Sequence, residues 1–245
     1  MPRNLRPIGR RASCTATVAL GCLWLVVGAT TAAANPPAEA PAYPLDGITR
    51  EVPKSGPLHC PDVALSDYRG ELVRWNVPGK VFTGMRDPLR AFETIARDVG
   101  IEIYGRPPAK IIQLGTYNCR RMRDYPGWIS EHALGNAVDV AGFDFGALSK
   151  DAPLPSGLDR AFRGGFEVRV GRHWNKRTGH AAVHTRFLET LALRMIERAH
   201  AQDGFRVLLG PGYPGHRDHF HFDMAPFRMV QIFVDGEPLE RRARR

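Results

Sequence analysis

Apolar side chains recur every three or four residues in two stretches of the chain, which is the spacing of an amphipathic helix. The first stretch follows Asp87 and Pro88, which favour a helix start because Asp caps free backbone N–H groups and Pro suits the first turn. We expect this helix to end at Gly100, and a second helix to cover residues 186–201. The two apolar stripes, interpreted as core faces, are Leu89, Phe92, Ile95, Ala96 and Val99, and Phe187, Leu188, Leu191, Met195 and Ala199.

Short apolar or alternating segments predict strands on either side of these helices. Strands and helices do not alternate in a regular βαβ order. The pattern therefore favours an α+β domain with a small, mostly antiparallel sheet and flanking helices. The predicted strands are residues 101–104, 110–114, 137–143, 166–170, 205–209, 219–225 and 229–234.

The first 34 residues have the layout of a secretory signal peptide. Four arginines precede residue 12, residues 12–34 carry no charge, and Ala32–Ala34 resemble a small-residue cleavage site. We therefore predict cleavage near Ala34, export across the inner membrane and a periplasmic location. An uncleaved membrane anchor is the alternative, and it would be the only association with a membrane.

Composition divides the rest of the chain into three parts. Residues 35–47 are rich in Pro and Ala and predict a flexible linker, residues 48–235 the folded domain, and residues 236–245 a basic tail. The net charge is +9, but the signal region and the tail hold much of it. The remaining small excess of positive charge is compatible with binding to an acidic wall polymer or a membrane surface. A solvated charged surface explains it equally well. No nucleic-acid motif is found, so no nucleic-acid partner is expected.

Two of the four cysteines, Cys60 and Cys119, lie outside the predicted signal peptide. They are either a disulfide or two separate thiols. An oxidising compartment favours the disulfide, and closing so long a loop would stabilise the fold by about 4 kcal/mol in the chain-entropy account.

One segment, SEHALGNAVDV, combines His132 and Asp139 seven residues apart. On a helix these two residues would lie about 10.5 Å apart along the axis, too far to share a metal ion. We therefore expect His132 in a loop, Asp139 on a strand, and a turn at Gly135 between them. Valines flank Asp139, and a buried carboxylate needs a compensating partner such as a metal.

A second segment, HRDHFHFDM, alternates strictly between apolar and polar residues. On a strand, its two Phe and its Met face the core, while His219, His221 and Asp223 share the other face. Exposed polar groups on an edge strand are the alternative. Together the two segments supply His and Asp ligands for one zinc ion, which in catalytic sites takes three protein ligands and leaves a position for water.

The paired motifs resemble the zinc metallopeptidase superfamily of lysostaphin-type enzymes, D-alanyl-D-alanine peptidases and the hedgehog domain. More closely, residues 117–120, SEHALGNAVDVAGF, VLLGPGY and HRDHFHFD resemble the extensin-like C-terminal domain family, over about residues 60–224. The resemblance implies a fold of the hedgehog and D-Ala-D-Ala-peptidase type. The extensin label is not taken as function, because the chain has no Ser-Pro repeats.

The resemblance also implies roles for individual residues. His132, Asp139 and His221 match the metal ligands, and His219 matches a group that handles protons or the developing oxyanion. Where the carboxypeptidase branch has a Glu base, this chain has Asp218, so His219, His216 and Asp218 compete for the role of base. Arg120 matches an arginine that binds a substrate carboxylate or polarises the scissile carbonyl, with Arg121 and Arg123 close to it.

Export and the resemblance together predict a secreted zinc hydrolase. Its expected substrates are D-amino-acid-containing stem or cross-link peptides of peptidoglycan, cleaved as a carboxypeptidase or an endopeptidase. The alternative is a metal-binding module that binds or structures the cell wall without cleaving it. The missing Glu base is the feature that keeps this alternative open.

Overall fold

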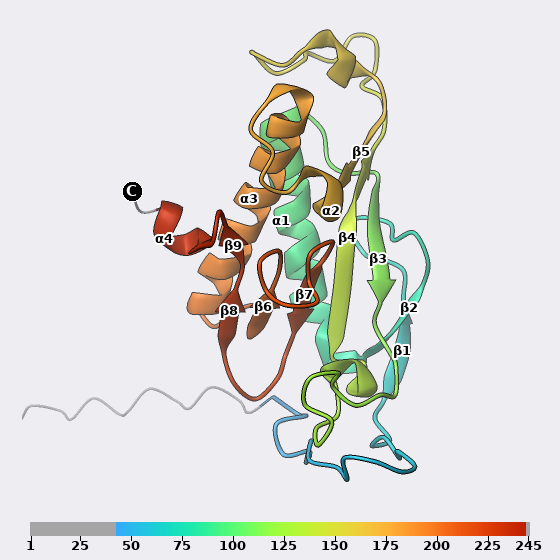
Figure 1. Cartoon of the computed structure of the whole chain (residues 1–245). Coiled ribbons are helices and arrows are strands. Elements are labelled where there is room, and N and C mark those ends of the chain that lie inside the picture. Colours follow the sequence, from blue (N-terminus) through green and yellow to red (C-terminus); the bar gives the residue numbers. More distant parts are fainter. Residues whose placement is uncertain (1–42, 244–245) are drawn as a thin grey trace, which may run out of the picture. The chain divides into compact units, whose positions relative to one another are not determined.

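A mostly antiparallel sheet forms the centre of the computed structural model, which describes residues 43–243 (Figure 1). The strand order is β3-β4-β7-β6-β8, and β5 pairs with the second half of β4. All pairs are antiparallel except β6 with β8. The bounds are β3 Lys110–Gly115, β4 Ala137–Phe145, β5 Phe166–Arg169, β6 Val207–Leu209, β7 Phe220–Asp223 and β8 Met229–Gln231.

Two long helices, α1 (Arg86–Tyr104) and α3 (Gly179–His200), pack on one face of this sheet (Figure 1). Phe92 of α1 lies 5.5 Å from Phe222 of β7, and Phe187 of α3 lies 5.1 Å from Phe143 of β4, between ring centroids. Burial of these aromatic side chains stabilises the helix–sheet interface. The predicted α+β class, with a small antiparallel sheet and flanking helices, is confirmed.

The predicted end of the first helix at Gly100, and the predicted strand over residues 101–104, are wrong. The helix runs on to Tyr104 because Ile103 and Tyr104 extend its buried face, and Gly105 ends it in the left-handed conformation. Gly100 is instead a point of close packing. A Cβ there would lie 2.9 Å from the carbonyl oxygen of Arg106, so the glycine permits the chain to pass directly beside the helix.

Shorter elements surround the central layers. The hairpin of β1 and β2, which sequence patterns did not predict, pairs antiparallel beside α1. The short elements are β1 Leu65–Tyr68, β2 Gly79–Phe82, α2 Val170–His173, β9 Phe233–Val234, β10 Glu237–Pro238, α4 Leu239–Ala243, and the 3-10 helices η1 Thr83–Met85, η2 Glu131–Leu134 and η3 Arg160–Arg163.

A buried carboxylate joins this hairpin region to α1. Glu93 is fully buried, and its two oxygens accept hydrogen bonds from the Tyr68 hydroxyl at 2.9 Å and the Trp75 indole at 3.0 Å, and from the backbone N–H groups of residues 71–73. A charge at this depth is tolerated because five donors replace its hydration.

Residues near both predicted domain boundaries belong to the core. Leu45, in the predicted linker, and Leu239, in the predicted basic tail, are each 3% exposed. Tyr43 also donates a hydrogen bond to Asn136 at 2.7 Å. The predicted signal peptide and residues 35–42 of the linker lie outside the described residues. Within the described range, no helix has the length and apolar character needed to cross a membrane.

Cys60 and Cys119 form a disulfide, which confirms the predicted pairing. The bond connects two segments 59 residues apart and attaches residue 119, next to the candidate site, to the region that precedes β1. The segment around residue 119 is therefore covalently attached to the region before β1.

We expect Glu93→Gln to lower the free energy of unfolding by about 2–3 kcal/mol, because an amide group replaces one acceptor oxygen and faces buried donors. Urea unfolding followed by circular dichroism measures the loss. Glu102→Gln is the matched control on the same helix, since its exposed ion pair with Arg194 contributes about 1 kcal/mol or less. Equal unfolding midpoints for the two variants would contradict the role given to Glu93.

Candidate metal centre

The pairing of β4 with β7 places two of the predicted ligands side by side. The register sets Asp139 opposite His221, and the Nδ1 atom of His221 lies 2.8 Å from the Asp139 Oδ1 atom. Phe220 and Phe222, which flank His221, are fully buried in the core. His221 therefore projects from the sheet face opposite the helices, as the alternation predicts.

The third predicted ligand, His132, comes from the 3-10 helix η2 just before β4. The Ser130 hydroxyl caps this helix by accepting from the His132 backbone N–H, and Gly135 ends it in the left-handed conformation with φ 59°. A Cβ on Gly135 would lie 2.9 Å from the backbone nitrogen of Phe82, so glycine allows this turn to pack directly against β2. The predicted turn at Gly135 and strand at Asp139 are observed, and His132 lies on a short 3-10 helix where a loop was predicted.

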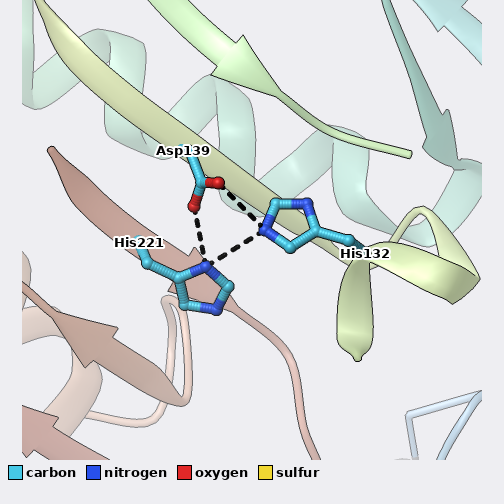
Figure 2. Close-up of side chains that lie close together, drawn as sticks. All are labelled: His132, Asp139 and His221. Carbon is cyan, nitrogen blue, oxygen red and sulfur yellow. Dashed lines mark hydrogen bonds and ion pairs between the residues drawn. The ribbon is translucent and has the colours of Figure 1, made fainter. Parts of the chain in front are cut away.

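Figure 2 shows the three side chains pointing toward one another. The Nε2 atom of His132 lies 3.2 Å from Asp139 Oδ2 and 3.2 Å from His221 Nδ1. One ligand atom from each residue lies within 4.8 Å of the other two. The Nδ1–H of His132 donates to the Thr116 carbonyl at 3.0 Å, so Nε2 is the ring nitrogen that faces Asp139 and His221. Two imidazoles and a carboxylate on convergent vectors fit a divalent metal ion.

Asp223 orients His221 from the side away from the cluster. Its Oδ2 lies 2.7 Å from His221 Nε2, its Oδ1 accepts from the Ala225 backbone at 2.8 Å, and the residue is 5% exposed. A carboxylate on the outer nitrogen of a ligand histidine fixes the ring and makes it a stronger ligand. Sequence analysis placed Asp223 on the polar face of the strand but gave it no role.

The acid groups set the protonation of this cluster. Burial alone would raise the pKa of Asp139, but hydrogen bonds from His132 and His221 hold that pKa well below its usual range. Burial lowers the pKa of His221, but its hydrogen bonds to Asp139 and Asp223 outweigh this effect and raise the pKa to about 9. Without a metal, His221 therefore carries a proton between two carboxylates, and a bound cation replaces that positive charge.

The three predicted candidates for a base occupy different positions. His219 Nε2 lies 3.7 Å from Asp139, and its Nδ1 is 2.8 Å from Asp218. The Asp218 carboxylate is 70% exposed and orients His219 rather than facing the ligands itself. The His216 ring lies 5.0 Å from that of His219, tilted by 44°, and its Nδ1–H donates to the Pro214 carbonyl. Burial lowers the pKa of His216, which favours its neutral form.

The candidate site opens into a cavity of about 770 Å³. His216, His219 and Arg120 all line it, so these predicted proton-handling and substrate-binding residues face the same space as the ligands Asp139 and His221, whereas His132 is not part of the lining. Asn118 links this wall to the centre, because its backbone N–H donates to the His132 carbonyl at 3.0 Å. Asp218 is absent from the lining.

Two other histidines, His173 and His184, are packed in the core. His184 is buried on α3, its Nδ1 lies 2.8 Å from the Tyr104 hydroxyl, and its ring packs 4.5 Å from that of His173. Burial lowers the pKa of His184 to about 4, so the ring is a neutral part of the core at neutral pH.

We expect Asp223→Asn to weaken Zn²⁺ binding about 10- to 100-fold, because the uncharged amide supports the His221 ring less well. Competition with a chromophoric chelator measures the affinity. Asp218→Asn is the control, since Asp218 contacts His219 and no predicted ligand. If both variants bind Zn²⁺ like the unmodified protein, Asp223 does not act through His221.

Comparison with known proteins identifies one related family. Residues 88–150 match the family described as Extensin-like protein C-terminus. The matched segment runs from α1 past the end of β4 and contains Arg120, His132 and Asp139, whereas His216, His219 and His221 lie beyond it. Comparisons with curated proteins and with solved structures found no match. Over residues 88–150, the chain is similar to the C-terminal region of extensin-like proteins.

Proposed function

We propose that this protein is a zinc-dependent hydrolase that cleaves peptide bonds in the stem or cross-link peptides of peptidoglycan. One observation carries the proposal: His132, Asp139 and His221 converge on one point that opens into a cavity, with His219 beside them. Two His and one Asp with space beside them is a donor set typical of catalytic zinc, which keeps one position free.

His132, Asp139 and His221 would hold the zinc ion. When bound, zinc supplies a Lewis acid that polarises a carbonyl group and lowers the pKa of water. Asp223 and the Thr116 carbonyl hold the two ligand imidazoles in place, so the donor atoms are oriented before any ion arrives.

His219 is the group best placed to move a proton. Its Nδ1 is engaged by Asp218, so its Nε2 faces the ligand cluster and is free to accept or deliver a proton. Asp218 then acts as the orienting partner of His219. His216, neutral and in ring contact with both His219 and His221, is the second candidate.

Arg120 is the proposed group for a substrate carboxylate or the scissile carbonyl. It is exposed on the cavity wall, and within residues 43–243 its side chain makes no hydrogen bond or ion pair. A guanidinium binds a carboxylate through two parallel hydrogen bonds, which suits peptides that end in free carboxylates.

The choice of peptidoglycan as substrate rests on the predicted export and on the family resemblance. The disulfide agrees with an oxidising compartment, and the periplasm remains the proposed location. Membership of the lysostaphin, D-Ala-D-Ala peptidase and hedgehog superfamily is part of the same proposal.

A module that binds metal and cell-wall peptide without cleaving it is the second candidate. The observation in its favour is that Asp218, at the position of the family's Glu base, points to His219 and does not line the cavity. If the protein cleaves its ligand nevertheless, proton transfer depends on the imidazole groups of His219 and His216 alone.

Metal analysis tests the first part of the proposal. We expect the purified protein to hold about one zinc ion per chain, and His132→Ala and His221→Ala to lose it, because two remaining ligands bind zinc weakly. Thr83→Ala is a control with no side chain in the site. Protein that neither contains zinc nor binds it when it is added would refute the metal centre.

Digestion of purified sacculi and cross-linked muropeptides, with products resolved by mass, tests the second part. We expect one type of peptide bond to be cut by the zinc-loaded protein. His219→Ala should lower the rate about 10²- to 10⁴-fold while the zinc content is unchanged, because proton transfer is lost and the ligands remain. A zinc-loaded protein that cuts none of the linkages would support the binding module instead.

A further inference from the structure

Large apolar side chains gather on the rim of the site cavity. Four of the exposed large apolar residues in the described part of the chain line it: Met122, Tyr125, Trp128 and Phe227. The other exposed ones, Val77, Ile101, Leu114 and Tyr117, lie outside the lining. Tyr125 is 59% exposed, Phe227 53% and Trp128 46%, so each keeps much of its ring in contact with water. Such a concentration of exposed rings around one cavity marks a ligand-binding surface.

The aromatic residues belong to two different segments. Tyr125 and Trp128 lie on a hairpin-like loop, residues 120–130, in which the Met122 N–H donates to the Trp128 carbonyl and the Ser130 N–H to the Arg120 carbonyl. We call this loop the aromatic wall. Phe227 lies in the connection from β7 to β8. Both segments line the cavity that contains the candidate metal centre.

Part of the cavity lining is apolar. Val207, Leu209 and Ala225 form a small cluster of their own, separate from the main core, with Tyr213 and Met229 packed against it. Leu208, between two of them, belongs to the main core, so Val207 and Leu209 project from the sheet face that carries His221. A ligand that covers these side chains gains from apolar burial.

The aromatic wall is held in place before any ligand binds. Arg121 donates from Nε to the Pro53 carbonyl at 2.8 Å and from Nη2 to the Gly56 carbonyl at 3.0 Å. The Val52 N–H donates to the Gly127 carbonyl at 2.8 Å, and the disulfide anchors Cys119 just before the loop. A braced loop loses little conformational entropy on binding, which favours a binding role.

The charge of the rim favours an anionic ligand. Arg120 and Arg123 are exposed, and within residues 43–243 their side chains make no hydrogen bond or ion pair. Of the acids in the lining, Glu131 pairs with Arg50, and Asp139 and Asp223 are bound to His221. Asp124 is the one remaining acid in the lining. The two free guanidinium groups therefore outnumber it.

We propose that this surface is a glycan subsite, an inference that rests on the proposed function. Tyr125 and Trp128 stack against the amino-sugar rings of a peptidoglycan strand, and Arg123, with Arg120, binds carboxylates of the attached peptide. A sugar ring offers a flat C–H face that matches an aromatic face, whereas the methyl and carboxylate groups of a short acidic peptide would leave these rings uncovered.

The size of the cavity agrees with a ligand of this kind. Cavities of about 300–1,000 Å³ hold drug-sized ligands, and the volume here, about 770 Å³, lies in the upper part of that range. It has room for more than the two residues that flank a scissile bond. The preferred substrate is therefore a peptide still attached to its glycan.

Binding to three ligands tests the proposal on the zinc-loaded protein. These are a disaccharide carrying its stem peptide, the same peptide released from the sugar, and the disaccharide alone, each titrated by calorimetry. We expect the first to bind about tenfold more tightly than the free peptide. Tyr125→Ala and Trp128→Ala should each weaken the first ligand about 5- to 30-fold, the range for truncating a central aromatic contact, and leave the free peptide unchanged.

Leu114→Ala is the matched control, because Leu114 is a large apolar residue, 58% exposed, outside the cavity. Trp128→Phe should retain most of the preference for the sugar-bearing ligand, since a ring remains. Equal binding of the sugar-bearing and free peptides would overturn the glycan subsite, and so would an equal loss for both ligands in the aromatic variants, which would assign the wall to the peptide.

The binding test distinguishes the glycan subsite from the proposed hydrolase activity. If the protein binds the disaccharide–peptide in preference to the free peptide but hydrolyses neither, the glycan subsite is supported and the proposed hydrolase activity is not. If it hydrolyses both at equal rates with equal affinity, the activity is supported and the glycan subsite is refuted.

Discussion

The register between β4 and β7 is the constraint on which the candidate centre depends. It brings Asp139 opposite His221, residues 82 positions apart in the chain, and Ala137 opposite Asp223. Side chains alternate along a strand, so a slip of one residue would turn His221 toward the core and a phenylalanine toward the cavity. The buried phenylalanines of β7 and the valines of β4 oppose such a slip, because they would lose their places against α1 and α3. The packing that stabilises the sheet therefore also aligns the ligands.

A continuous chain of hydrogen bonds then orders the polar side of this sheet. It runs from the Ala225 backbone through Asp223, His221, Asp139 and His132 to the Thr116 carbonyl. Each residue in this chain provides a partner for a buried polar group of the next residue. These contacts offset most of the desolvation free energy of placing charged residues beside a hydrophobic core. Asp139 and His221 line the cavity, while His132 lies buried beside them. The centre is thus assembled by the protein alone and needs little rearrangement to accept an ion.

Local patterns in the sequence predicted the features that depend on local chemistry. The alternation in HRDHFHFDM predicted which face of β7 meets the core, and the spacing of His132 and Asp139 predicted a loop followed by a strand. Features that depend on tertiary contacts were not predicted. Gly100 reads as a helix end, but the buried side chains of Ile103 and Tyr104 continue α1 past it, and the glycine makes room for the Arg106 carbonyl just after the helix. Arg121 holds the aromatic wall in place through hydrogen bonds to backbone carbonyl groups, and no sequence pattern reveals such bonds. Asp223 lies on the predicted face, yet its role depends on which nitrogen of His221 it meets.

Strand β7 has only four residues, and neighbouring side chains point to opposite faces of the sheet. Phe220 and Phe222 are packed among aromatic rings of the core, while His221 and Asp223 serve the candidate centre. Substitutions at adjacent positions are therefore limited by different requirements. On the core side the volume and shape of the side chain matter, and on the other side its donor and acceptor atoms matter. One short strand thus carries packing groups and ligand groups on opposite faces, which makes β7 sensitive to two different kinds of substitution.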